Sequence, residues 1–310
     1  MDAGVNSSVG VDETGAVPVV LPDPPRLSVV QRAKWHLNAW RSSPRSVWPD
    51  MPYPTVALSY WVPDGPEKPV NFGDELSRSI VELMLARRGA TLLDSAPAQR
   101  QLLSIGSVLH MAREGATIWG TGLHGTMSAC EHRYRSLDIR AVRGPVTQRF
   151  LRQRGIDAPS VFGDPALLLP VLTGKRFTPS GEHAVGFVPN LHDMEFLRTS
   201  GMRERHPDIV VIDPLRSWNT VVSEIARCQL IIASSLHGLV TAEALGIPAR
   251  YVRLTEHEAK LKYYDYYNGT GRPLVYSTSI EAALQDGGMP FDGFDPGPLM
   301  DAFPYDLWGL

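Results

Sequence analysis

The sequence predicts two α/β domains in tandem, each built on a parallel sheet, with a cleft between them. Three observations support this prediction. Short apolar runs alternate with amphipathic segments from residue 55 onward, as in chains that fold into parallel sheets covered by helices. A polar stretch at 173–182 (TGKRFTPSGE) interrupts the alternation, which then restarts. The length of 310 residues also exceeds what one hydrophobic core usually serves.

The first predicted domain covers residues 51–172. Its expected strands are the apolar runs TVALSYW, LLSIG, ATIWG and DIRAVRG. The first expected helix, 74–88, carries its apolar residues on one face. The second is GPVTQRFLRQRG, with Pro145 in its first turn and Gly155 at its end. The segment SVFGDPALLLP closes this half of the chain.

The second predicted domain covers residues 183–278. Its expected strands are AVGFVP, DIVVID, QLIIAS and ARYVRL, and its expected helices are SWNTVVSEIARC and GLVTAEALG. In open parallel sheets, ligands bind beyond the carboxyl ends of the strands. The loops that follow these strands are therefore where we expect a site. The tail, 279–310, contains one expected helix (SIEAALQD) and is expected to pack across the domain junction.

Residues 1–50 form a separate leader in this prediction. The first 27 residues are rich in Pro, Gly, Val and Asp without any period, which predicts disorder. An amphipathic helix is expected at 29–41 (VVQRAKWHLNAWR). It has two interpretations: a helix that packs on the first domain, or one that lies on a membrane surface near a lipid-linked acceptor.

The composition excludes several classes of protein. A formal net charge of −3 argues against a general nucleic-acid binder. Cys130 and Cys228 have neither the number nor the spacing of a disulfide framework or a zinc site. No apolar run approaches the roughly 20 residues of a membrane span, and no secretory signal is recognisable. We therefore expect a cytoplasmic protein that needs no metal.

The most informative segment is QLIIASSLHGLVTAEALGIP. The expected turn consists of Ser234, Ser235, Leu236 and His237, and Gly238 opens the expected helix. The first amides of a helix are unpaired and attract anions, and a histidine beside them is suited to general acid–base chemistry. The alternative is that the serines only cap the helix. Glu243 is expected to hold the imidazole, to hold a sugar hydroxyl, or to be solvated.

Two further segments carry charged candidates. In NFGDEL, Gly73 permits close backbone approach and Asp74 is either a helix N-cap or a carboxylate that takes a proton from a sugar hydroxyl. In AVRGPVTQRF, Arg143 follows a strand. It is either a fork for phosphate or carboxylate, or the partner of a structural ion pair with a loop residue such as Asp164.

Two glycine-containing loops complete the candidate set. The residues expected to line the cleft with backbone amides are Gly106, Ser107, Gly120, Thr121 and Gly122. The loop WGTGLHG reads as GxGxxG, and Asp138 lies near the offset of a dinucleotide-binding fingerprint. However, this loop does not follow the first strand of its domain, and no clear helix follows it. Lining amides are therefore the favoured interpretation.

Together, these segments resemble the polysaccharide pyruvyltransferase family. The resemblance lies in NFGDEL, the GS and GTG loops, RGP, FGDPALLLP and ASSLHGLVTAEALGIP, and extends from about residue 71 to residue 254. It implies a GT-B-like fold of two Rossmann-like domains. It also implies phosphoenolpyruvate as donor and a sugar with two suitably placed hydroxyls as acceptor, joined as a cyclic ketal.

The resemblance also implies roles for individual residues. His237 matches the general acid of the family, Arg143 its donor-binding arginine, and Asp74 its N-terminal acidic residue, beside Asn71 and Gly73. One departure is that Asn190 follows Pro189 where the family pattern has a histidine. Two other functions remain open: a GT-B glycosyltransferase that uses a nucleotide sugar, and an inactive sugar-binding relative.

Overall fold

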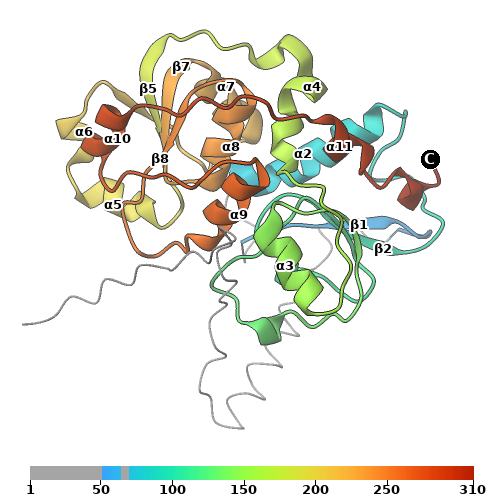
Figure 1. The fold of residues 1–310 in the computed structure, drawn as a ribbon. Helices are drawn as coiled ribbons and strands as arrows, with labels where there is room; N and C mark the ends of the chain where they lie inside the picture. The colour runs from blue at the N-terminus through green and yellow to red at the C-terminus, as the bar shows by residue number, and fades with distance from the viewer. Residues whose placement is uncertain (1–50, 64–69) are drawn as a thin grey trace, which may run out of the picture.

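The computed structural model describes residues 51–63 and 70–310 and contains two four-stranded parallel sheets (Figure 1). The first sheet has the order β1-β2-β3-β4. Its strands are β1 (Val56–Ser59), β2 (Arg100–Leu103), β3 (Thr117–Trp119) and β4 (Asp138–Ala141). All three pairings are parallel. β1, β3 and β4 lie within predicted runs, whereas β2 begins two residues before the run LLSIG and overlaps only its first two residues.

The second sheet has the order β6-β5-β7-β8. Its strands are β5 (His183–Val188), β6 (Ile209–Val211), β7 (Cys228–Ala233) and β8 (Ala249–Tyr251). The register pairs Val188 with Ala233 and Ala233 with Tyr251, so that the carboxyl ends of three strands are level. The predicted fold class, two Rossmann-like domains with parallel sheets, is therefore confirmed.

Helices follow the strands of the first sheet. The segments are α2 (Phe72–Ala86), the 3-10 turns η1 (Leu109–Met111) and η2 (Ala129–Glu131), α3 (Pro145–Gln153), η3 (Pro165–Leu168), α4 (Leu169–Thr173) and η4 (Gly174–Phe177). The start predicted for α2 was wrong by two residues. The N-cap is Asn71, whose side chain accepts from the Gly73 amide, so Asp74 lies in the first turn and does not cap the helix.

The second half is richer in helices than the sequence predicts. Its segments are α5 (Asp193–Thr199), α6 (Met202–Arg205), α7 (Trp218–Ala226), α8 (Leu236–Ala244), α9 (Leu261–Gly269), α10 (Ile280–Asp286), α11 (Gly297–Asp301) and η5 (Tyr305–Trp308). Helix α8 begins at Leu236 and not at Gly238, because Ser235 caps it by accepting from the Gly238 amide. His237 therefore belongs to the first helical turn.

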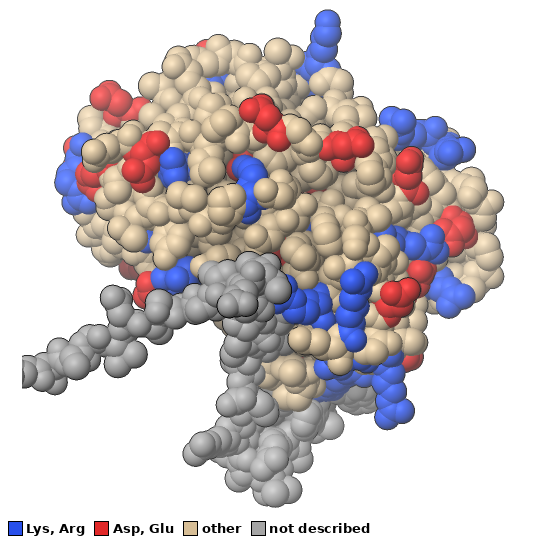
Figure 2. Space-filling model, in the orientation of Figure 1, with Lys and Arg blue, Asp and Glu red and all other residues tan. Residues whose placement is uncertain are grey.

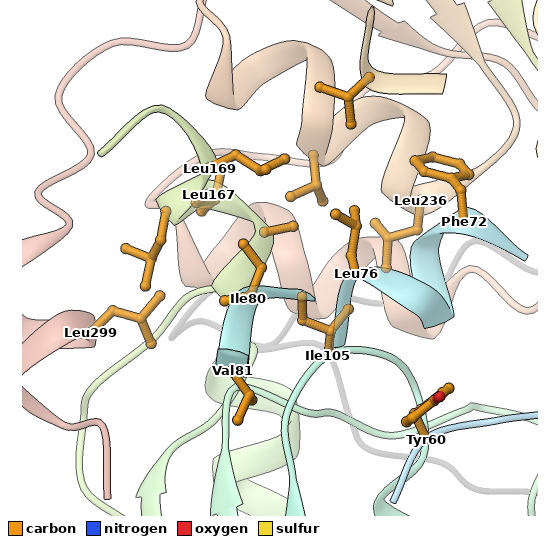
Figure 3. Close-up of a cluster of buried hydrophobic side chains, with 14 of the residues drawn as sticks. Tyr60, Phe72, Leu76, Ile80, Val81, Ile105, Leu167, Leu169, Leu236 and Leu299 are labelled. Carbon is orange, nitrogen blue, oxygen red and sulfur yellow. The ribbon is translucent and has the colours of Figure 1, made fainter. Parts of the chain in front are cut away.

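Helix α2 joins the two halves of the molecule. The Phe72 amide donates to the carbonyl of Pro214 at 2.9 Å, and the Trp218 amide donates to Glu75 at 3.0 Å. Figure 3 shows Leu76 of α2 beside Leu236 of α8, within a cluster of buried side chains that includes residues of both sheets. Buried apolar side chains therefore form part of the junction.

The tail contacts both halves of the molecule. Met289 forms an isolated bridge with Ala249 of β8, and the Trp119 indole donates to the carbonyl of Leu299 at 2.8 Å. Figure 1 shows this segment running from α10 beside the second sheet to α11 and the C-terminus beside the first. The final residues thus lie far from the strand β8 that precedes them.

Three features bear on the predicted contact with a membrane: the helices, the segment 29–41 and the surface charge. Within 51–63 and 70–310, no helix is both long and apolar enough to cross a membrane. The predicted helix at 29–41 lies outside the described residues. On the face shown in Figure 2, Lys and Arg side chains are spread over the upper and lower parts of the molecule, with Asp and Glu side chains among them.

Candidate active site

Two of the predicted residues, Gly73 and His237, follow the carboxyl ends of strands from different sheets and meet at the junction of the two halves. Helix α2, which follows β1, and helix α8, which follows β7, contact each other through Gly73 and His237. A Cβ on Gly73 would overlap Nδ1 and Cγ of the imidazole. The absence of a side chain at Gly73 thus gives His237 its place, which is the close approach predicted for this glycine.

His237 and Asp164 face each other at this point. Nε2 of His237 lies 3.6 Å from Oδ2 of Asp164, and neither atom has a hydrogen-bond partner. Asp164 is fully buried, and its other oxygen, Oδ1, caps η3 by accepting from the Ala166 amide at 3.0 Å. The histidine side chain remains 13% exposed, so a small molecule can reach it.

Asp74 is the second titratable group of the site. Burial raises the pKa of Asp74 to about 6, although the charges of His237 and Lys262 lower it. The residue retains some exposed surface, and a Cβ on Gly106 would lie 3.6 Å from its Oδ1. A carboxylate with a pKa near neutrality is suited to proton transfer.

Lys262 is the cation whose charge acts on both Asp74 and His124. Lys262, in the first turn of α9, forms an ion pair with Glu258. Burial lowers the pKa of His124 to about 4, and the positive charges of Lys262 and Arg143 lower it further. His124 is therefore neutral near pH 7. Lys262 thus adds a cation near Asp74.

Arg143 lies beneath the site, fully buried. Its Nε donates to Asp265 at 3.2 Å, its Nη1 to Ser107 at 2.6 Å, and its Nη2 to the carbonyl of Leu123 at 2.8 Å. The ion pair considered as an alternative thus exists, but its partner is Asp265 of α9 and not Asp164. Ser107, predicted to line the site, is held by this guanidinium.

The turn after β7 is fixed by hydrogen bonds. The Asn190 amide donates to Oγ of Ser234 at 3.0 Å, and the Asn190 side chain donates to Asp193 at 2.9 Å. A Cβ on Gly238 would lie 2.8 Å from Cβ of Val188, so this glycine lets α8 approach β5. Ser234 and Ser235 therefore both take part in hydrogen bonds that hold the turn and the start of α8 in place.

Glu243 is separate from His237 in its contacts. Its carboxylate receives two hydrogen bonds from Arg272, at 2.9 and 2.7 Å, and a third from Tyr266. The residue is buried. None of the three environments considered from the sequence (imidazole, sugar hydroxyl or solvent) is the one observed, because the arginine follows α9, whose position the sequence did not predict.

The glycine loop after β3 does not form a dinucleotide fingerprint. That motif requires a helix that opens directly after the glycines, whereas the loop continues to η2. Thr121 donates to the carbonyl of Gly106 at 2.7 Å, and a Cβ on Gly122 would lie 2.6 Å from the Arg143 guanidinium. Gly120 has a φ of 94°. These residues pack around the Arg143 guanidinium and the Gly106 carbonyl, and their predicted contact with a ligand stays a prediction.

A cavity of about 260 Å³ lies elsewhere, at the amino-terminal edge of the first sheet. It is lined in part by Arg100, Thr117, Asp138 and Asp306. Among these residues, Asp138 and Asp306 both bind Arg140. Because ligands of parallel sheets bind at the opposite edge, the junction with His237 and Asp74 is the better candidate for an active site.

Four residues of the site were not selected from the sequence: His124, Asp164, Lys262 and Asp265. His124 and Asp164 lie inside motifs that were recognised, but their contacts depend on distant elements. Lys262 and Asp265 belong to LKYYDYYNG, where the buried Asp265 interrupts the apolar pattern that would have predicted a helix. The sequence contains no local signal that pairs Asp265 with Arg143.

The family follows from comparison with known proteins. Residues 93–254 match the family model described as polysaccharide pyruvyl transferase. That range is more than half of the 310 residues, and the chain belongs to this family. The match includes Arg143, Asp164 and His237 but begins after Asp74. The predicted resemblance is thus confirmed, over a shorter range at its N-terminal end.

Two relatives extend the comparison. The succinoglycan biosynthesis protein ExoV of Rhizobium meliloti (strain 1021) is 27% identical over 251 residues, which are 74% of this chain and 73% of ExoV. The uncharacterized protein L143 of Acanthamoeba polyphaga mimivirus is 26% identical over 227 residues, which are 70% of this chain and 75% of L143. No solved structure gives a significant match.

Proposed function

We propose that the protein transfers pyruvate from phosphoenolpyruvate to two hydroxyls of a sugar in a polysaccharide or glycolipid precursor, forming a cyclic ketal. The observation that carries the proposal is the meeting of His237 and Asp74 at the domain junction. The reaction needs an acid for the donor and a base for the acceptor, and these two residues can supply them. Family membership supports the same reaction class.

The acid acts first in the proposed mechanism. His237, as imidazolium, protonates the methylene carbon of phosphoenolpyruvate, and the central carbon becomes an oxocarbenium-like electrophile. Its position in the first turn of α8 supports this role, because the nearby helix amides attract the anionic donor. The neutral imidazole remains after the proton has moved to carbon.

Two hydroxyls of the sugar then replace phosphate. Asp74 accepts the proton of the first hydroxyl as that oxygen attacks the central carbon. Inorganic phosphate leaves, and the second hydroxyl closes the ketal with loss of its proton. Fixed positive groups stabilise the anionic donor and leaving group. Lys262 contributes one such charge, and Arg143 is proposed to act on the donor together with Ser107.

The test is a comparison of ligands and products. Phosphoenolpyruvate should raise the melting temperature by mass action, and inorganic phosphate should raise it less. A sugar acceptor should gain the mass of the pyruvate ketal, and His237→Gln should lose this transfer while still binding the donor. Stabilisation by UDP or GDP, with no response to phosphoenolpyruvate, would instead indicate a glycosyltransferase. A response to sugar alone would indicate an inactive binding protein.

A further inference from the structure

We propose that Asp164 is the positioning residue of His237: its Oδ2 holds a proton on Nε2 of the imidazole, so that Nδ1 is the nitrogen that serves the substrate. The inference deepens the proposed function and rests on it for the role of His237. It starts from two polar atoms without partners. Oδ2 of Asp164 and Nε2 of His237 are both buried and unbonded, 3.6 Å apart.

Oδ2 of Asp164 and Nε2 of His237 are suited to bond to each other, because neither has another partner. A buried carboxylate oxygen without a hydrogen bond is costly, and Oδ1 of the same residue is already used in the cap of η3. The distance of 3.6 Å is beyond a hydrogen bond, but a shift of about half an ångström would form one. Such bonds often tighten only when the substrate is bound.

The surroundings of the imidazole decide which nitrogen faces the substrate. Nε2 is buried against the carboxylate, whereas Nδ1 lies over Gly73, at the start of the helix that carries Asp74. Loss of the Nδ1 proton to carbon then leaves a neutral ring with its hydrogen on Nε2, donated to Asp164. The carboxylate thereby favours the imidazolium before transfer and fixes the tautomer after it.

The charged groups that face His237 come from several elements. Asp164 precedes η3, Asp74 lies in α2, and the charge of Lys262 of α9 acts on Asp74. Asp164→Asn removes the charge and keeps an oxygen that can cap η3. Asp295 provides a matched control, because its Oδ1 also accepts the amide two residues later, from Gly297 at 2.9 Å, in an exposed segment.

The experiment follows His237 by NMR in the free protein, with His237→Gln used to assign its resonances. In wild type, the neutral ring should carry its hydrogen on Nε2; a hydrogen on Nδ1 would overturn the proposal without any variant of Asp164. In Asp164→Asn, the oxygen that caps η3 leaves the amide NH2 group toward Nε2, so the hydrogen of the neutral ring should move to Nδ1. In Asp295→Asn it should stay on Nε2. A hydrogen that stays on Nε2 in Asp164→Asn would also overturn the proposal.

Kinetics with phosphoenolpyruvate give the second readout. Asp164→Asn should lower kcat by at least about tenfold, the scale of an impaired general acid, with KM for the donor within about threefold of wild type. A rise in KM with unchanged kcat would contradict a positioning role. If wild type transfers no pyruvate but the hydrogen of the neutral ring still moves from Nε2 in Asp164→Asn, the contact between Asp164 and His237 stands and the proposed function fails.

Discussion

The pKa of Asp74 predicts how the rate depends on pH. Burial raises this pKa to about 6, so the carboxyl is protonated below that pH and cannot accept the proton of the acceptor. On the acid side, the transfer rate should rise about tenfold per pH unit through the loss of this one proton, and this rise should end near pH 6. Measured rates of ketal formation between pH 4 and pH 8 test this.

Two variants separate Asp74 from other groups. Asp74→Asn should react slowly and should lose the inflection near pH 6. Glu82→Gln, on the exposed face of the same helix, where Glu82 pairs with Arg78, should keep the wild-type profile. An inflection that persists in Asp74→Asn would assign the base to another residue.

Arg143 makes a second prediction at the scale of single residues. A lysine keeps the charge beside Asp265 but cannot also reach Ser107 and the Leu123 carbonyl. Because a charge-assisted hydrogen bond contributes about 1.5–3 kcal/mol, Arg143→Lys should raise KM for phosphoenolpyruvate by about 10- to 100-fold. Ser107→Ala, which leaves the guanidinium in place, should raise KM less. A lower melting temperature with unchanged KM would restrict Arg143 to folding.

At the scale of elements, the contact of α2 with α8 depends on Gly73. Alanine is the better helix former, by about 1 kcal/mol, and Gly73 has no left-handed backbone conformation to preserve. Gly73→Ala should therefore fold, yet its methyl group must displace the imidazole of His237. We expect a loss of kcat of at least about tenfold with little loss of stability.

The control for this variant lies on the same helix. Ser79→Ala changes a partly exposed residue of α2 and should preserve both rate and stability. Thermal melts and single-turnover kinetics of the two variants provide the comparison. Full activity in Gly73→Ala would mean that His237 can leave this position without consequence for the reaction.

The elements also show what the sequence could predict. The eight strands follow from short apolar runs, most of which include buried residues. The starts of α2 and α8 were misplaced by two residues, since a capping side chain ahead of the first glycine defines each start. Helix α9 was missed because Asp265, a buried charge, faces Arg143 and not solvent. A contact between distant elements, such as that of Asp265 with Arg143, produces no periodic pattern in the sequence from which it could be predicted.

At the scale of the whole molecule, the shared core predicts cooperative unfolding. Leu76 of α2 and Ile231 of β7 belong to one buried cluster, although they come from different halves of the chain. Leu76→Ala should cost about 2–5 kcal/mol, and urea unfolding, followed by fluorescence and circular dichroism, should remain a single transition. Leu93→Ala, at a site that is 47% exposed, should change stability little. Two separate transitions in wild type would show that the halves fold independently.

The docking of α2 also limits how such chains can be recombined. The element that carries Asp74 belongs to the first half by sequence but contacts the second half through Pro214 and Trp218. In a chimera joined within 173–182, α2 would face a second half from another protein and could lose its contacts with the segment that contains Pro214 and Trp218 in this chain. Grafting new acceptor specificity from a relative therefore requires the exchange of α2 together with the second half, rather than the exchange of either half alone.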